Sequence, residues 1–336
     1  MANAEFNMPA AVRAATSAKL VSLARNPVPS GAVCATFAGH DGTVLRFARW
    51  DATRGPRRGT VCVFSGRGEF IEKYFEVIAD LRRRGYAVAM HDWRGQGGSA
   101  RLLADRRKGH VRSFSEYDAD LTRFMKDVVL PDCPPPYIAL AHSMGGNILL
   151  RNATIQGSWF DRMILTAPML ALADEKVPAP QALAKIYARL LGWGPTGHLY
   201  VLGGNEVPEE AKQFEGNGLT SDIERFERNK QIVEMAPELA LGSPTIAWLR
   251  AAYQSCDYVM SPDFSLRVRV PMLLVAAGQD RIVSSSATEG LARRLKIGAR
   301  VVIGGSRHEI LQERDEMRQR FWAAFDAYLG IAAAAA

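Results

Sequence analysis

The residues best suited to chemistry lie in the run Ala141-His142-Ser143-Met144-Gly145-Gly146, between an apolar segment and a segment of helical pattern. A serine in a tight strand-to-helix turn is a nucleophile elbow. The turn requires small residues two positions before and after the serine. Gly145 meets this requirement, and Ala141 stands where glycine is usual. Because the following helix would direct free amides and its positive dipole end toward developing negative charge, we predict Ser143 as a nucleophile.

A serine hydroxyl attacks only when a base removes its proton, and histidine has the pKa suited to that role. The chain has six histidines: His40, His91, His110, His142, His198 and His308. We predict His308 as the base, because it lies just after the last expected strand, where a loop can carry it over the serine. His142 is expected to point away and pack. His91 and His110 are expected to make local hydrogen bonds, with His110 the alternative base.

The imidazole needs a carboxylate to orient it. Asp280 follows an expected strand at 271–276 and the turn Gly278-Gln279, which puts it at the carboxyl edge of a parallel sheet. The order Ser143, Asp280, His308 is the order of the triad in α/β-hydrolases. We therefore predict Asp280 as the acid.

A tetrahedral oxyanion needs two backbone donors. The amide of Met144, directly after the predicted nucleophile, is one. The glycine-rich run Ser65-Gly66-Arg67-Gly68 follows an earlier expected strand, and we assign the amide of Arg67 as the second. The Arg67 side chain is open to a surface salt bridge or to a substrate phosphate.

Other chemistries fit the sequence less well. Gly95 to Ala100 matches the dinucleotide pattern G-x-G-x-x-A, but no helical periodicity opens directly after it. HExxH, P-loop and EF-hand patterns do not occur. The four cysteines are scattered without a CxxC spacing, so we expect reduced, buried thiols. We predict no metal and no cofactor.

The elements that must position these residues alternate between strand and helix, which is typical of a mostly parallel sheet covered by helices. Expected strands cover residues 32–38, 43–50, 60–64, 86–91, 137–142, 163–167, 271–276 and 300–303. The first two form a hairpin with His40 in its turn, where we expect no role for it. Expected helices cover about 70–84, a segment opened by the capping box Ser113-x-x-Glu116, a segment beginning at Ser143, 285–295 and 310–329.

Between about Met169 and Pro262 the pattern contains helices and loops but no expected strand. Leu183, Ile186, Tyr187, Leu190 and Leu191 form one apolar stripe at helical spacing. Ser221-x-x-Glu224 is expected to be a second capping box. We divide the chain into an N-terminal extension (1–28), a first part of the α/β core (29–168), an inserted helical cap (169–262), a second part of the core (263–330) and an alanine tail (331–336).

The composition excludes several classes of protein. The 336 residues are 48% hydrophobic and 23% charged, a globular mixture, and the apolar runs fall short of the ~20 residues of a membrane-spanning helix. The net charge of +7 is spread along the chain without a nucleic-acid-binding pattern, so we expect no nucleic-acid partner. The oligomeric state stays open.

The N-terminal segment does not look like a signal peptide, because Arg13 and Lys19 interrupt its apolar stretch from Met8 to Leu23. A frayed surface helix and a basic amphipathic helix that touches a membrane are both open. We expect a cytoplasmic protein, with a peripheral position at the inner membrane surface and a transient membrane contact left open.

Taken together, the motifs resemble those of the lysophospholipase and monoacylglycerol lipase branch of the α/β-hydrolases, also described as serine aminopeptidase-like hydrolases. The resemblance runs from about Pro29 to Leu329. It is carried by Ser65 to Glu69 with Lys73-Tyr74, Asp92 to Ser99, Gly109-His110-Val111, His142 to Gly146, Thr166 to Met169, Asp280 and His308-Glu309. Monoacylglycerol lipases typically have His-Gly where this chain has Ser65-Gly66, and the following Arg67 is more similar to bacterial lysophospholipases. The resemblance implies an eight-stranded core and a helical cap, and it suggests a lysophospholipid or monoacylglycerol substrate.

The sequence thus predicts a serine hydrolase that cleaves carboxylic esters through an acyl-enzyme. The cap residues Leu183, Ile186, Tyr187, Leu190, Phe226 and Trp248 are available to shelter an acyl chain or to form cap core. A peptidase, a thioesterase or a short-chain esterase on the same fold is the alternative within enzymes. A catalytically inactive binding protein is the alternative outside them.

Overall fold

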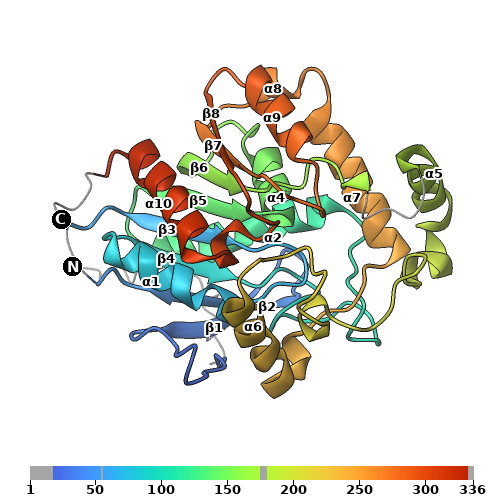
Figure 1. The fold of residues 1–336 in the computed structure, drawn as a ribbon, viewed down its shortest axis with the longest axis horizontal. Helices are drawn as coiled ribbons and strands as arrows, with labels where there is room; N and C mark the ends of the chain where they lie inside the picture. The colour runs from blue at the N-terminus through green and yellow to red at the C-terminus, as the bar shows by residue number, and fades with distance from the viewer. Residues whose placement is uncertain (1–17, 54–55, 175–179, 332–336) are drawn as a thin grey trace, which may run out of the picture.

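A computed structural model describes residues 18–53, 56–174 and 180–331. Its centre is one eight-stranded sheet in the order β1-β2-β4-β3-β5-β6-β7-β8 (Figure 1). The strands are β1 (Val33–Ala38), β2 (Val44–Trp50), β3 (Thr60–Phe64), β4 (Ala87–His91), β5 (Tyr137–His142), β6 (Phe160–Thr166), β7 (Met272–Ala277) and β8 (Gly298–Ile303). β1 and β2 pair antiparallel, β2 pairs antiparallel with β4, and the remaining pairs are parallel. The predicted fold class, a mostly parallel eight-stranded sheet flanked by helices, is confirmed.

Helices cover both faces of the sheet. They are α1 (Phe75–Arg83), α2 (Phe114–Phe124), α3 (Leu130–Asp132), α4 (Met144–Asn152), α5 (Gln181–Leu191), α6 (Ile223–Met235), α7 (Ile246–Met260), α8 (Phe264–Arg267), α9 (Ser285–Arg294) and α10 (Asp315–Leu329). On one face α1 lies beside α10 (Figure 1), where Arg318 pairs with Asp80 and Arg84 with Asp326. The other face carries α2, α4 and α7, which contact one another.

The core of the sheet is rich in aromatic rings. Phe64, at the end of β3, is fully buried and lies within about 6 Å of the rings of His91, Trp93, Phe124 and Phe160. Because Phe64 ends the strand that leads into the Ser65–Gly68 loop, its packing fixes where that loop begins.

The predicted strands all occur, with small shifts at their ends; β6, for example, begins at Phe160 rather than Met163. Two helix predictions were wrong in detail. The N-cap of α6 is Asp222, which accepts a bond from the Arg225 amide, and Ser221 instead bonds Glu313. The final helix is interrupted, because Glu313 turns back to accept bonds from the amides of Arg307 and Ser221 and the backbone there is extended.

The predicted cap segment, residues 169–262, contains helices and loops and no strand among its described residues, only isolated bridges. In Figure 1, α5 lies at the right-hand edge of the molecule and α7 connects it to the core. The domain boundaries themselves stay a prediction.

Within the described part of the chain, no helix is long and apolar enough to cross a bilayer. The expected N-terminal helix and the alanine tail fall largely outside the described residues, and residues 18–32 contain no helix.

Replacing Phe64 by Ala should lower the free energy of unfolding by about 3–5 kcal/mol, because it leaves a cavity inside the aromatic cluster. Val302→Ala in β8, where the side chain is 48% exposed, is the matched control and should change stability by about 0.5 kcal/mol or less. Urea denaturation followed by circular dichroism measures both; equal effects would contradict the role assigned to the cluster.

Candidate active site

Ser143 lies in a strained turn between β5 and α4. Its φ of 52° and ψ of −114° are values that a non-glycine residue rarely adopts. Two bonds hold the turn: the Ser143 amide donates to the Thr166 carbonyl at 3.0 Å, and the Met169 amide donates to the Ser143 carbonyl at 2.9 Å. Such a backbone lifts the hydroxyl above the sheet edge, as the elbow motif predicts.

Gly145 is required by close approach rather than by its φ angle. A Cβ at this position would lie 2.6 Å from the Phe64 carbonyl oxygen and 2.7 Å from that of Ser65. Only glycine lets the elbow approach the end of β3 this closely. Ala141, which replaces the usual glycine, is fully buried within β5 opposite Phe64 and Leu165.

The structure brings the three predicted catalytic side chains together from the ends of β5, β7 and β8. The His308 Nε2 atom lies 2.9 Å from Ser143 Oγ, and its Nδ1 atom lies 2.8 Å from Asp280 Oδ2. Asp280 Oδ1 also accepts bonds from the amides of Ile282 and Val283, at 2.8 and 3.0 Å. The arrangement can therefore pass the serine proton to an imidazole that a fixed carboxylate orients.

The two loops that carry the acid and the base are bonded to each other. The Gly278 amide donates to the Ile303 carbonyl and the Gln279 amide to the Ser306 carbonyl. The cap segment adds a second support, because the Glu309 amide donates to the Leu219 carbonyl and Arg307 donates to the carbonyls of Asn217 and Thr220. No motif or periodicity in the sequence indicates this contact between residues 217–220 and the loop that carries His308.

Burial and the neighbouring charge act in opposite directions on His308. Burial lowers the pKa of its imidazole, but the Asp280 carboxylate, together with the charges of Glu309 and Glu69, outweighs burial, so the pKa lies above its usual value. For Asp280, burial raises the pKa, and the imidazolium with the two backbone bonds lowers it to a net value below the usual range. The carboxylate thus stays ionised beside the imidazole at neutral pH.

The two backbone donors predicted for an oxyanion are unoccupied. Neither the Arg67 amide nor the Met144 amide donates a hydrogen bond to any described residue. The loop that carries Arg67 is held by the Gln96 side chain, which donates to the Gly66 carbonyl and accepts from the Gly68 amide. Gln96 belongs to the run that resembles a dinucleotide motif, and no helix follows that run before α2.

A buried ion network, which the sequence did not reveal, supports the same loop. Glu69 accepts bonds from the Gly66 amide and the Tyr74 hydroxyl, and Lys73 Nζ lies 3.3 Å from Glu69 and 2.6 Å from Glu309. Burial raises the pKa of Glu69, but the charge of Lys73, with the hydrogen bonds from Tyr74 and Gly66, lowers it to about 2. Glu210 of the cap segment lies 3.5 Å from the same ammonium group, so the network joins the cap segment to the loop.

Next to Ser143 lies a cavity of about 530 Å³ that extends between the core and the cap segment. Its lining includes Ser143, His308, Arg67 and the cap residues Leu183, Ala184, Tyr187, Leu202, Val207, Trp248, Leu249 and Tyr253. The lining is mainly apolar and aromatic, with a few charged groups. It therefore suits a ligand that has a long apolar part and a polar end.

The remaining histidines differ in part from the predictions. His142 does not point away: it lines the cavity, its ring lies 4.7 Å from that of His308, and burial lowers its pKa to about 4. His91 makes no hydrogen bond among the described residues, because aromatic rings surround it. His110 bonds Thr245 and does not line the cavity, so the geometry does not favour it as the base.

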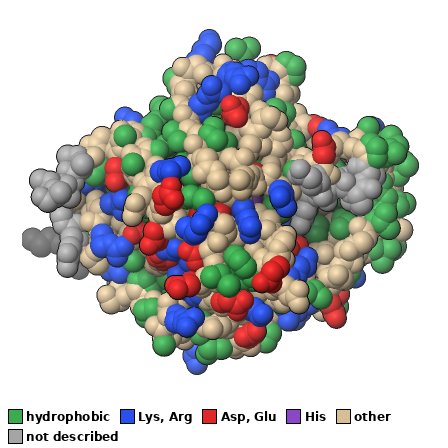
Figure 2. All heavy atoms as spheres, viewed as in Figure 1, with side chains coloured by type: hydrophobic (Ala, Val, Ile, Leu, Met, Phe, Trp, Pro, Cys, Tyr) green, Lys and Arg blue, Asp and Glu red, His purple; other side chains and the backbone are tan. Residues whose placement is uncertain are grey.

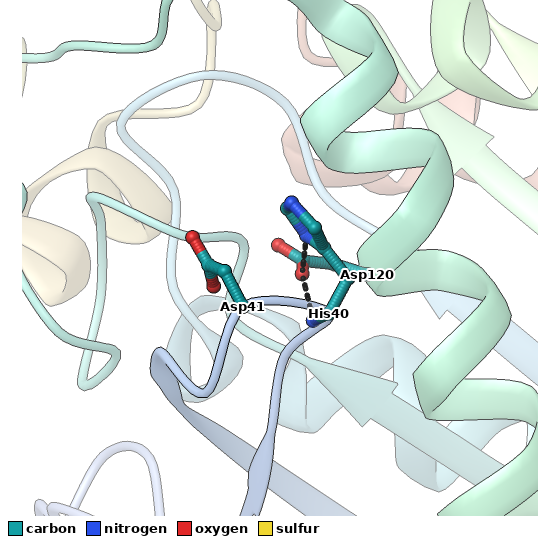
Figure 3. A group of neighbouring side chains, drawn as sticks. All are labelled: His40, Asp41 and Asp120. Atoms are coloured by element: carbon teal, nitrogen blue, oxygen red, sulfur yellow. Dashed lines mark hydrogen bonds and ion pairs between the residues drawn. The ribbon is translucent and has the colours of Figure 1, made fainter.

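His40, with no predicted role, meets Asp41 and Asp120 in a cluster that has the spacing of a metal site (Figure 3). However, Arg94 donates to both carboxylates and approaches the His40 ring at 2.8 Å. A cation would have to displace this guanidinium, so the cluster is better described as an ion network that anchors the β1–β2 turn to α2.

The sequence was compared with known families. Residues 55–315 match the family described as "Serine aminopeptidase, S33" (Hydrolase_4). The chain belongs to this family. The predicted membership in the α/β-hydrolases is therefore confirmed, and the protein is a hydrolase. Lysophospholipase L2 of Escherichia coli K12 is 32% identical to this hydrolase over 84% of the chain and 83% of that protein. A monoacylglycerol lipase of Mycolicibacterium smegmatis is 29% identical over 49% of the chain and 56% of that protein.

Solved structures share the fold of this hydrolase at low sequence identity. A carboxyl esterase of Bacillus coagulans superimposes with a TM-score of 0.71 at 20% identity, covering 90% of this chain and 99% of that one. The monoacylglycerol lipase of Paleococcus ferrophilus gives 0.67 at 20% identity, covering 86% and 99%.

We predict that His308 in the folded protein titrates above about 6.5, its usual pKa, and that Asp280→Asn shifts the titration downward. The imidazolium–carboxylate pair then stabilises the fold. Its full contribution is present at pH values below the pKa of His308 in the unfolded protein, and it is lost as the pH rises through the pKa of His308 in the folded protein. NMR titration of ring-labelled histidine, with His308→Gln to assign the signal, measures both. An Asp280→Asn protein with an unchanged titration would contradict the pairing.

Proposed function

We propose that the protein is a serine hydrolase that cleaves carboxylic esters of lipids, lysophospholipids or monoacylglycerols, through an acyl-enzyme. The observation that carries the proposal is the hydrogen-bonded series Ser143–His308–Asp280 at the floor of an apolar cavity. Neither a surface serine nor a buried structural serine needs an oriented imidazole beside it. The 32% identity to a lysophospholipase L2 supports the lipid ester as substrate.

In the proposed reaction, His308 Nε2 takes the proton of Ser143 Oγ as the oxygen attacks the ester carbonyl. The amides of Arg67 and Met144 stabilise the oxyanion, and Asp280 stabilises the imidazolium. The imidazolium then protonates the leaving alcohol, which departs and leaves the acyl group on Ser143. Water, deprotonated by the same imidazole, hydrolyses the acyl-enzyme.

The cavity favours this substrate class over the alternatives on the same fold. Its apolar lining can take an acyl chain, whereas a peptide would need backbone partners along its length. A thioesterase and a short-chain esterase use the same catalytic groups, and only a comparison of substrates separates them. An inactive binding protein would not need the free amides opposite Ser143.

A fluorophosphonate probe should label the wild-type protein, and Ser143→Ala should abolish the labelling. Ser243→Ala is the control, because Ser243 lines the same cavity but its hydroxyl contacts the Asn205 amide rather than a histidine. Gel fluorescence after equal exposure measures both. An unlabelled wild-type protein would favour the binding-protein alternative, and labelling that Ser243→Ala abolishes would reassign the nucleophile.

The cap segment also suggests where the enzyme meets its substrate. The buried residues of α5 are the small Ala184 and Ala188. Of the predicted apolar stripe, Leu183 and Tyr187 line the cavity, whereas Ile186, Leu190 and Leu191 are exposed outside its lining. The exposed apolar residues of α5 and the following loop, called the apolar cap surface here, are Leu183, Ile186, Leu190, Leu191, Trp193, Leu199, Leu202 and Val207.

We propose that the apolar cap surface rests on a lipid bilayer. Figure 2 shows hydrophobic side chains gathered at the right-hand edge, where Figure 1 places α5. The surface is continuous with the cavity, because Leu183, Leu202 and Val207 belong to both. Exposed Arg189 on α5 adds attraction to anionic headgroups, whereas Lys185 is paired with Asp257. A lipid could thus pass from the bilayer into the cavity without crossing water.

The double variant Ile186→Glu, Leu190→Glu should bind vesicles at least tenfold more weakly than wild type, because both apolar side chains are more than half exposed and acquire charge. Ile155→Glu, at a similarly exposed position outside the surface, is the control and should bind like wild type. Co-sedimentation with vesicles of phosphatidylglycerol and phosphatidylethanolamine measures the difference. Equal binding by the two variants would refute this docking surface.

A further inference from the structure

Arg67 brings a positive charge to the cavity without a carboxylate partner. Its Nη2 atom donates to the Gly242 carbonyl, and its guanidinium lies 5.4 Å from the ring centre of Trp248. Nε is buried without a hydrogen-bond partner, and none of the ion pairs among the described residues involves Arg67. Most of the donor capacity of this guanidinium is therefore unused.

Arg67 is half-buried, and two arginines that are almost fully buried show the usual pairing. Arg46 is paired with Glu72 and Asp92, and Arg94 is paired with Asp120, Glu116 and Asp41. Because an isolated buried charge is costly, burial is normally matched by such carboxylates. Arg250 also lacks a carboxylate, but it lies outside the cavity lining, with its guanidinium 3.5 Å from the ring centre of Trp193.

The carboxylates of Glu209 and Glu210 act on Arg67 through their charge, but neither forms an ion pair with it. Glu69 and Glu309 line the cavity but are paired with Lys73, and Glu209 is paired with Lys212. Burial lowers the pKa of Arg67 to about 10, which still leaves it charged at neutral pH. Among the described residues that line the cavity, Arg67 is thus the cation that has no carboxylate partner.

The position of the Arg67 side chain next to the proposed oxyanion site indicates which class of ligand it would bind. The backbone amide of Arg67 is the proposed oxyanion donor, so its side chain begins next to the reacting carbonyl. In a lysophospholipid, only the glycerol backbone separates the ester carbonyl from a phosphate, and guanidinium groups bind phosphate through two parallel hydrogen bonds. A monoacylglycerol carries no charge at this place.

We propose that the Arg67 guanidinium binds the headgroup phosphate of a lysophospholipid, and so selects this substrate over a neutral monoacylglycerol. The inference rests on the proposed function and deepens it: one residue holds the oxyanion through its backbone and the phosphate through its side chain. The Trp248 ring beneath the guanidinium fixes the cation where the headgroup must lie.

The first test compares kcat/KM for a lysophosphatidylglycerol and a monoacylglycerol that carry the same acyl chain, both below their micellar concentrations. Arg67→Gln should lower the ratio of the two values by roughly ten- to a hundredfold, because a charge-assisted contact is lost for one substrate only. Arg250→Gln, which removes another arginine without a carboxylate partner, outside the cavity lining, is the matched control and should leave the ratio unchanged.

Damage to the oxyanion loop by Arg67→Gln would lower both rates together and leave the ratio unchanged. That outcome would overturn the inference while leaving the proposed function intact. If the wild-type protein hydrolyses neither lipid, the proposed function is wrong. A binding measurement then tests separately whether Arg67 binds a phosphate.

Binding is measured with Trp248 as the reporter, in the Ser143→Ala protein titrated with dodecyl phosphate. Adding Arg67→Gln to this protein should lower its affinity for dodecyl phosphate at least tenfold. The same substitution should leave its affinity for the neutral dodecyl glycerol ether unchanged. Equal affinity of the two proteins for dodecyl phosphate would overturn the phosphate site. Inorganic phosphate binding as tightly as dodecyl phosphate would overturn the assignment to a lipid headgroup.

Discussion

The bond between Ser143 and His308 depends on three loops that meet at one edge of the sheet, although 165 residues separate the two side chains in the chain. The parallel strands β5, β7 and β8 all end at this edge, so their following loops are neighbours whatever their distance in sequence. The backbone strain at Ser143 persists because bonds to Thr166 and Met169 hold the turn on both sides. Without this support the hydroxyl would not stand at the height where the imidazole reaches it.

A second set of contacts ties the chemistry to the cap segment. Residues 217–220 bond the loop of His308, and Glu210 reaches Lys73 in the network that holds the Gly66–Arg67 loop. The segment that shapes the cavity thus also positions the proposed base and the proposed oxyanion donors. A change in the cap segment can therefore alter turnover without touching a substrate.

The proposed roles of the cavity, the apolar cap surface and Arg67 together describe one route by which a lipid would move from the bilayer to Ser143. An amphipathic lipid would leave the bilayer at α5, place its acyl chain along the apolar wall and its ester at Ser143. Its phosphate would then lie where the unpaired guanidinium stands. An apolar wall with one unpaired cation would match an amphipathic substrate.

The sequence by itself determined the order of strands and helices, the elbow at Ser143 and the candidates Asp280 and His308, because turn chemistry, periodicity and chain order are local properties. It could not decide that α5 turns Leu183 and Leu190 outward, since helical spacing marks an apolar face without saying what that face meets. Nor could it decide that His142 enters the cavity, that Ser221 yields its capping position to Asp222, or that Lys73 gathers three glutamates. These outcomes depend on which side chains from distant segments become neighbours in the tertiary structure. Burial and charge pairing arise only between such neighbours, so the sequence alone does not reveal them.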